Sequence, residues 1–171
     1  PIVDTENDAI ETYKKSKADV LYINGIKYQE EKLISLIVPT YDNDEKLKMM
    51  LESLKKIGVF CDENIEVLII QNHFDIQKYQ DTQKLEKKYA IKVYHEPRQG
   101  KSCALNYGIK KAQGKFIVST DDDVIITDKN WLYKFVEEFD KNPRLGYCSG
   151  KVSMYKETSN EYSQLWEKKG G

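Results

Sequence analysis

Three adjacent aspartates, Asp121, Asp122 and Asp123, directly follow the apolar segment FIVST. Neighbouring carboxylates repel one another, so a turn that only reverses the chain would be more stable without them. If the backbone stays extended, Asp121 and Asp123 point to one side and Asp122 to the other. Such a pair, together with a diphosphate, supplies the oxygen ligands that Mg²⁺ or Mn²⁺ prefers. The triplet predicts a divalent cation site, and a solvated turn is the alternative.

A basic loop precedes the aspartates and opens a predicted helix. Arg98 and Lys101 supply positive charge, and Gly100 lets the backbone approach a ligand closely. With Ser102 as the expected cap, the first N–H groups of the helix and its positive dipole end would face an anion. These features predict a phosphate site, and a plain loop with solvated basic residues is the alternative.

The letters Gly100-Lys101-Ser102 also suggest the P-loop of a nucleoside triphosphatase. That motif reads Gly-x-x-x-x-Gly-Lys-Ser/Thr, and here its first glycine is replaced by His95. A proline, Pro97, also lies inside the loop. The P-loop is therefore a minor alternative.

The elements that must position these residues alternate between strands and helices. Strands are expected at 33–41, 65–70, 91–95, 115–120 and 145–155, and helices at 43–57, 77–89, 102–113 and 128–140, with a weaker helix at 160–169. This alternation predicts an α/β fold with a mostly parallel sheet, flanked by helices and joined by right-handed crossovers.

Polar residues stand where three of these strands end. Ligands of parallel α/β sheets bind outside the carboxyl ends of the strands, so these positions form the candidate site. They are Thr40 and Tyr41, Gln71 and Asn72, and the aspartates 121–123.

Helix limits follow from capping residues and apolar spacing. Asp42 or Asn43 can cap the first of the four helices, and Asp128 can cap the last. The first helix should bury Leu47, Met50, Leu51 and Leu54. The helix that follows the basic loop should end at Gly114, and its inner face should consist of Ala104, Leu105, Ile109 and Ala112.

Composition excludes several classes of protein. With 171 residues, 40% hydrophobic residues and 32% charged residues, the chain is expected to be globular. Its net charge of -1 gives no support for nucleic-acid binding, which needs a clustered basic face. No apolar run reaches the roughly 18 residues of a membrane span, and the polar start predicts no signal peptide. Three scattered cysteines favour a reducing compartment. We expect a cytoplasmic protein without a transmembrane segment, with peripheral membrane association left open.

Three segments, taken in order, resemble family 2 glycosyltransferases with the GT-A fold. They are SLIVPTYDNDEKLKMMLESL, IEVLIIQN and RQGKSCALNYGIKKAQGKFIVSTDDD. The last is similar to the family pattern N-x-G-K-x-x-A-L-N-x-G-I … A-x-G-x-x-I … D-x-D. The resemblance extends from about Leu33 to the end of the chain. It implies a GT-A nucleotide-sugar-binding domain at 33–171. Residues 1–32 form a lead-in, in which the residue pattern predicts a helix at 5–18 and a short strand at 20–23.

The resemblance also implies a role for each matching residue. Arg98 and Lys101 would lie near the diphosphate of the donor, and Asp121 near its ribose. Asp123, with Asp121, would hold Mn²⁺ or Mg²⁺, which acts as a Lewis acid on the leaving diphosphate. The nucleotide-sugar site would consist of Pro39, Thr40, Tyr41, Gln71, Asn72, Arg98, Lys101, Asp121 and Asp122.

Two features depart from the family pattern. Many members carry Asp at the end of the second strand, where it pairs with the base; Gln71 and Asn72 stand there instead, which weakens the inference of a uracil nucleotide. No residue matches the catalytic base, which is expected beyond Gly171 in an acceptor-side half. The implied function is inverting transfer from a UDP-sugar to a carbohydrate or lipid-linked hydroxyl, in polysaccharide or glycoconjugate synthesis. Whether the fragment alone is active is left open. A non-catalytic α/β binding module with a decayed donor site is the alternative.

Overall fold

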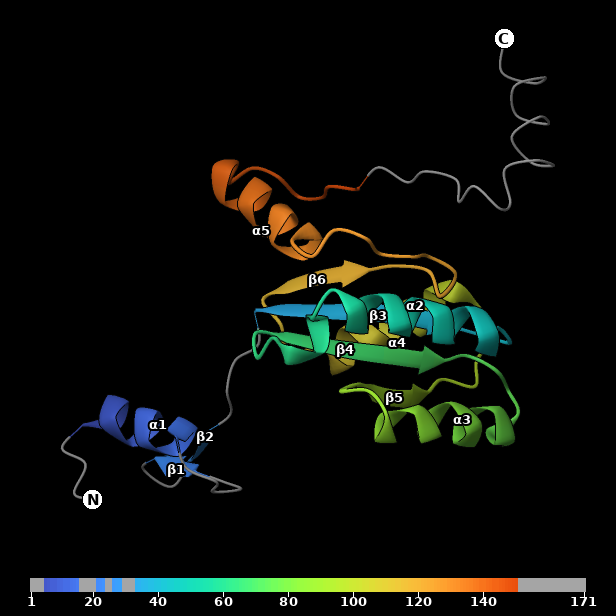
Figure 1. The fold of residues 1–171 in the computed structure, drawn as a ribbon, viewed down its shortest axis with the longest axis horizontal. Coiled ribbons are helices and arrows are strands. Elements are labelled where there is room, and N and C mark those ends of the chain that lie inside the picture. Colours follow the sequence, from blue (N-terminus) through green and yellow to red (C-terminus); the bar gives the residue numbers. More distant parts are fainter. Residues whose placement is uncertain (1–4, 16–20, 24–25, 29–32, 151–171) are drawn as a thin grey trace, which may run out of the picture. The chain divides into compact units, whose positions relative to one another are not determined.

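The computed structural model describes residues 5–15, 21–23, 26–28 and 33–150 (Figure 1). The chain divides into two compact units, residues 1–129 and 130–171. The first unit begins with helix α1, Glu6–Lys15, followed by strand β1, Leu21–Ile23, which pairs antiparallel with β2, Ile26–Tyr28. The predicted helix and short strand are confirmed over these residues, and the rest of their predicted ranges, 16–18 and 20, lies outside the described residues. Strand β2 was not predicted.

A four-stranded parallel sheet follows, with the strand order β5-β4-β3-β6 (Figure 1). Its strands are β3, Ile34–Thr40; β4, Ile65–Gln71; β5, Lys92–His95; and β6, Phe116–Ser119. All three pairings are parallel, as the alternation of elements predicts. The central strands β3 and β4 are buried along nearly their whole length, since helices cover both faces of the sheet.

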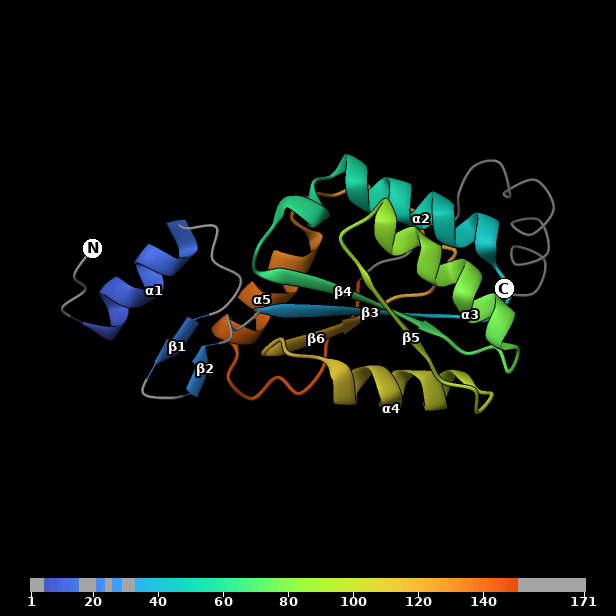
Figure 2. The same cartoon turned by 90° about the horizontal axis from the view of Figure 1, so that it is seen from below.

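Helices α2, Asp44–Lys56, and α3, Ile76–Gln83, cover one face of the sheet, and α4, Lys101–Lys111, covers the other (Figure 2). The chain moves outward from β3 through β4 to β5 and then returns to β6 on the far side of β3. Because right-handed crossovers change face when the direction of travel reverses, β3 and β6 diverge at a topological switch point. Ligands bind in such folds at that point, beyond the carboxyl ends of the strands.

Most boundaries agree with the sequence, but several caps do not. Helix α4 begins at Lys101 after Gly100, so Ser102 lies inside its first turn and does not cap it. Helix α3 ends at Gln83 and continues as a short 3₁₀ helix, Lys84–Lys87, where one helix to residue 89 was expected. A second 3₁₀ turn, Val59–Cys61, follows α2.

The packing of α2 is confirmed: Leu47, Met50, Leu51 and Leu54 are all buried. The predicted inner face of α4 is partly wrong. Ala104 and Gly108 are buried and Leu105 and Ala112 pack partly against the core, but Ile109 is 49% exposed. Gly108 determines which side of α4 faces the sheet. A Cβ at this position would lie 2.6 Å from Ile37 Cγ2, so only a glycine lets α4 approach the sheet this closely.

The second unit contains helix α5, Trp131–Lys141, whose N-cap position is Asn130 and not the predicted Asp128. The strand expected at 145–155 is absent from 145–150, and its remainder lies outside the described residues, as does the helix expected at 160–169. No helix in the described part of the chain is both long enough and apolar enough to cross a membrane.

A cluster of buried polar side chains holds the turn between α4 and β6. This turn lies at the amino edge of the sheet, opposite the carboxyl ends of the strands. Ser35 Oγ donates to Glu66 Oε1 at 2.6 Å and accepts from the N–H of Gly114 at 2.8 Å. Gln113 N–H also donates to Glu66 Oε1, at 2.6 Å. A Cβ on Gly114 would stand 2.4 Å from the backbone nitrogen of Ser35, so the turn can pass here only as glycine.

We therefore expect Gly114→Ala to destabilise the fold by about 1–3 kcal/mol, the usual range for forced overpacking. Urea unfolding followed by circular dichroism measures this change. Gly146→Ala is the control, since a Cβ at Gly146 meets no atom within 4 Å. Equal stability of the two variants would contradict the close approach of the Gly114 turn to β3.

Candidate functional site

A cavity of about 640 Å³ lies at the carboxyl edge of the sheet, at the switch point between β3 and β6. Its volume falls in the range of small-molecule sites. Its lining comes from the ends of β3, β4 and β6, the start of α4 and the acidic turn: Pro39, Thr40, Tyr41, Asp42, Asn43, Asn72, Gly100, Lys101, Asp121, Asp122 and Asp123. Every site residue predicted from the sequence lines this cavity except Gln71 and Arg98.

Gln71 points away from the cavity. It is fully buried, its Nε2 donates to Thr82 Oγ1 at 2.8 Å, and its Oε1 accepts from the N–H of His73 at 3.1 Å. Its side chain thus ties the end of β4 to α3 and has no surface to offer a ligand. The prediction that Gln71 contacts the donor therefore finds no support in its position.

The three aspartates have different partners. Asp122 accepts from Thr40 Oγ1 at 2.6 Å and from Asn43 Nδ2 at 3.3 Å, so it braces the end of β3. Asp121 pairs with the ammonium of Lys101, and Asp123 Oδ2 lies 3.7 Å from Lys46 Nζ. The backbone turns at 122–123 and is not extended there, yet Asp122 is still separated from its two neighbours.

The carboxylates of Asp121 and Asp123 are about half exposed, and each meets one lysine ammonium group. Across the described ranges, no group of three or more acidic, histidine or cysteine side chains is arranged to hold a metal ion. Two carboxylates fit a Mg²⁺ or Mn²⁺ ion that takes its other ligands from water and phosphate oxygens. They do not fit an ion held by protein ligands alone.

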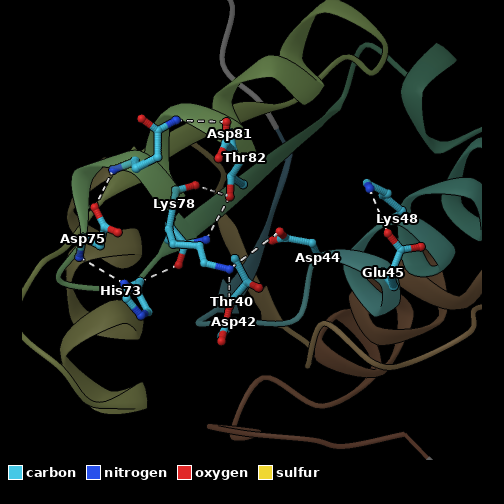
Figure 3. Close-up of polar contacts among 12 residues, drawn as sticks. Thr40, Asp42, Asp44, Glu45, Lys48, His73, Asp75, Lys78, Asp81 and Thr82 are labelled. Atoms are coloured by element: carbon cyan, nitrogen blue, oxygen red, sulfur yellow. Dashed lines mark hydrogen bonds and ion pairs between the residues drawn. The ribbon is translucent and has the colours of Figure 1, made fainter.

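A lysine that the sequence did not single out supports the cavity wall. Lys78 of α3 pairs with Asp42 and lies 4.0 Å from Asp44 at the start of α2 (Figure 3). The hydrogen bond and charge of Lys78 lower the pKa of Asp42. This contact joins the helix predicted at 77–89 to the β3–α2 loop.

Aromatic rings gather beside the cavity at the ends of β3 and β4. The ring centroids of Tyr41 and His73 are 4.7 Å apart, and those of His73 and Phe74 are 4.5 Å apart. Gln99 Nε2 donates to the hydroxyl of Tyr41 at 3.1 Å, which links this group to the basic loop. Tyr41 and Phe74 are 44% and 64% exposed, so flat apolar surface remains open to solvent here.

The basic loop, residues 96–100, is held by internal hydrogen bonds to one buried carboxylate. Glu96 is buried, and its carboxylate accepts from the N–H of Arg98 at 3.0 Å, from Arg98 Nε at 2.9 Å and from Arg98 Nη2 at 2.6 Å. The guanidinium of Arg98 is therefore committed to Glu96 and does not line the cavity. These contacts lower the pKa of Glu96 to about 2.

This pKa shift predicts a pH dependence. The folded carboxyl has a pKa of about 2 against an ordinary 4.5, so its stabilising effect is complete above pH 4.5 and is lost as pH falls toward 2. Arg98→Met should lower the melting temperature at neutral pH, and the difference from the native chain should shrink as pH falls below 4.5. Thermal unfolding across this range, with the exposed Lys56→Met as the control, measures it. A difference that is independent of pH would refute the pairing.

Comparisons with known proteins agree with this arrangement. The family Glycosyl transferase family 2 matches residues 35–170. An uncharacterized glycosyltransferase from Rickettsia conorii is 31% identical over 128 residues, covering 74% of this chain and 20% of the relative. The poly-beta-1,6-N-acetyl-D-glucosamine synthase of Staphylococcus epidermidis is 28% identical over 134 residues, covering 78% of this chain and 32% of the synthase. The chain thus spans between 20% and 32% of the length of these relatives.

Two solved structures share this fold. S. aureus TarS 1–349 in complex with UDP superposes with a TM-score of 0.54 at 24% identity, over 72% of this chain and 39% of that one. Mannosyltransferase PcManGT from Pyrobaculum calidifontis, in complex with GDP-Man and Mn²⁺, gives a TM-score of 0.55 at 20% identity, over 82% of this chain and 41% of that one. With its parallel sheet and the family match over most of its length, the chain belongs to glycosyl transferase family 2 and has the GT-A fold.

Proposed function

We propose that this chain forms the donor-binding part of a metal-dependent glycosyltransferase. The enzyme takes a nucleotide sugar, with a UDP-sugar as the expected donor, and transfers the sugar with inversion to a hydroxyl of a carbohydrate or lipid-linked acceptor. In this proposal residues 33–171 belong to the donor domain and residues 1–32 to a lead-in, and no residue of this chain is assigned as the catalytic base. A role in polysaccharide or glycoconjugate synthesis and a cytoplasmic location belong to the same proposal.

One observation carries this proposal: the cavity places an acidic turn opposite the N-terminus of α4. Lys101, at the start of α4, reaches Asp121 across the cavity. A diphosphate with its cation needs both kinds of surface, because the cation needs carboxylates and the phosphates need N–H groups and an ammonium. Neither surface alone would distinguish this ligand from a simple anion or cation.

The donor would be held in three parts. Its diphosphate would meet Lys101 and the first turn of α4, and its base would stack near Tyr41. Asp121 and Asp123 would hold Mg²⁺ or Mn²⁺, which supplies Lewis acidity to the departing diphosphate when bound. Asp122 would act indirectly, by holding Thr40 at the end of β3. The UDP bound to TarS and the GDP-Man and Mn²⁺ bound to PcManGT support a nucleotide-sugar donor and a divalent cation as the ligands.

The two other interpretations account for less of the site. A P-loop would need a glycine where His95 stands, and the loop before α4 is instead fixed by Glu96 and Arg98. A non-catalytic module would have no need to keep two exposed carboxylates facing a helix N-terminus across a cavity. Both interpretations give different results in a binding experiment.

The test is a thermal-shift screen of UDP, GDP, CDP and ATP, each with Mn²⁺, Mg²⁺ or EDTA. A ligand at about 100 times its Kd stabilises the fold by roughly 2.7 kcal/mol, which is readily measured. We expect metal-dependent stabilisation by at least one nucleoside diphosphate. Stabilisation by ATP alone would support the P-loop, and no shift with any nucleotide would support the decayed module.

A further inference from the structure

The side chain of Asn72 is occupied by the basic loop. Asn72 follows β4, is buried, and lines the cavity. Its Nδ2 donates to the carbonyl oxygens of Glu96 and Arg98, both at 2.7 Å, and its Oδ1 accepts from the N–H of Gly100 at 2.8 Å. One side chain therefore joins three points of residues 96–100 to the end of β4.

Few of the hydrogen bonds that Asn72 can make are left for a ligand. A carboxamide has two N–H donors and an oxygen with two lone pairs. Both donors and one lone pair of Asn72 are used on the loop. With Gln71 turned toward Thr82, neither amide at the end of β4 presents a free donor to the cavity. The acceptor groups of a nucleobase would find no partner in either side chain.

The loop that Asn72 holds determines where the helix N-terminus stands. Gly100 has a φ of 127°, a conformation that L side chains rarely adopt, and it directly precedes the first residue of α4, Lys101. Gly100, whose N–H is bound by Asn72, is therefore the residue directly before Lys101, whose ammonium group pairs with Asp121. If Asn72 released the loop, the N–H groups of α4 and Lys101 would lose their fixed direction.

We infer that Asn72 is a positioning residue for the phosphate site and does not select the nucleobase. This inference rests on the proposed function, since it assigns a role within the same donor site. Because the Asn72 side chain is bound to residues 96–100 (the loop clamp) and the Gln71 side chain to Thr82, base selection is left to other groups. Affinity should then depend on Asn72 through the diphosphate, whichever base is attached to it.

Asn72→Asp tests this role directly. The variant keeps the size of the side chain but places a carboxylate oxygen against the carbonyls of Glu96 and Arg98, which breaks the clamp. We expect the affinities for UDP, GDP and inorganic pyrophosphate to fall by a common factor of about ten or more, while that for uridine stays unchanged. Isothermal titration calorimetry in the presence of Mg²⁺ measures the affinities for UDP, GDP and pyrophosphate, and ligand-observed NMR measures the affinity for uridine.

Two further variants complete the design. Asn72→Ala removes the clamp without adding charge and should give the same pattern if the aspartate variant folds poorly. Asn64→Asp makes the same chemical change at the exposed amino end of β4 and should leave all four affinities unchanged. Increased amide hydrogen exchange at residues 96–100 in the Asn72 variants would show that the loop has been released.

The outcomes separate this inference from the proposed function. If the native chain binds UDP, but Asn72→Asp lowers uridine affinity and leaves pyrophosphate affinity unchanged, Asn72 reads the base and the inference is wrong. A tenfold change in the ratio of UDP to GDP affinity would also overturn it. If the native chain binds no nucleotide with or without metal, the proposed function fails, and the role of Asn72 fails with it.

Discussion

Asp123→Ala is expected to abolish metal-dependent nucleotide binding while leaving the fold intact. Asp123 is half exposed, lies on the turn after β6, and has Lys46 at 3.7 Å as its partner. An exposed ion pair of this kind contributes at most about 1 kcal/mol, so a divalent cation can replace the ammonium group. Loss of one of two carboxylate ligands should weaken Mn²⁺-dependent UDP binding by about 100-fold or more, about 2.8 kcal/mol.

The matched control for this variant is Asp81→Ala. Asp81 is also an exposed carboxylate paired with a lysine, Lys84, at 2.6 Å, but it lies on α3 and does not line the cavity. Titration of UDP in the presence of Mn²⁺ and of EDTA, with melting temperatures for all variants, separates binding from folding. Unchanged Mn²⁺-dependent binding in Asp123→Ala would remove Asp123 from the cation site.

The sheet and the position of the site could be predicted because they depend on local patterns. The strands that became β3, β4, β5 and β6 are short apolar runs, and each begins and ends within one residue of its expected limits. In a parallel sheet their polar ends must share one edge, so the sequence brings Thr40, Asn72 and the aspartates together without further information.

The direction of individual side chains could not be predicted in the same way. Gln71 and Asn72 both follow an apolar strand, but one bonds to Thr82 and the other to a loop more than twenty residues away. Glu66 lies inside the apolar run IEVLII, where its partners Ser35 and Gln113 come from distant segments. Such choices depend on tertiary neighbours, which the spacing of apolar residues does not encode.

The caps show the same limit. Asn43 occupies the N-cap position of α2 as expected, but its side chain accepts no capping hydrogen bond, and its Nδ2 donates to Asp122. Helix α4 starts one residue before Ser102, since the Gly100 backbone already provides the required bend. Local capping preferences are worth about 1 kcal/mol, and tertiary hydrogen bonds of similar strength override them.

Lys101→Ala is expected to have opposite effects on two ligands. The ammonium group lies at the start of α4 and pairs with Asp121, so it is positioned both to bind phosphate and to compete with a cation. Its loss should weaken UDP by about ten- to 100-fold, through a charge-assisted contact, while leaving uridine affinity nearly unchanged. Equal weakening of UDP and uridine would place Lys101 away from the phosphates.

In the same variant, Mn²⁺ binding without nucleotide should become tighter, because Asp121 no longer has an ammonium group beside it. In the native chain, a diphosphate that accepts a hydrogen bond from the Lys101 ammonium group frees Asp121 for the cation. Each ligand should therefore raise the affinity for the other, and this coupling should decrease in Lys101→Ala. Mn²⁺ titration followed by electron paramagnetic resonance, with and without UDP, measures both effects, and Lys84→Ala is the control. A lysine that only stabilised the fold would weaken both ligands together, so tighter Mn²⁺ binding beside weaker UDP binding is the specific signature of a lysine shared between the two.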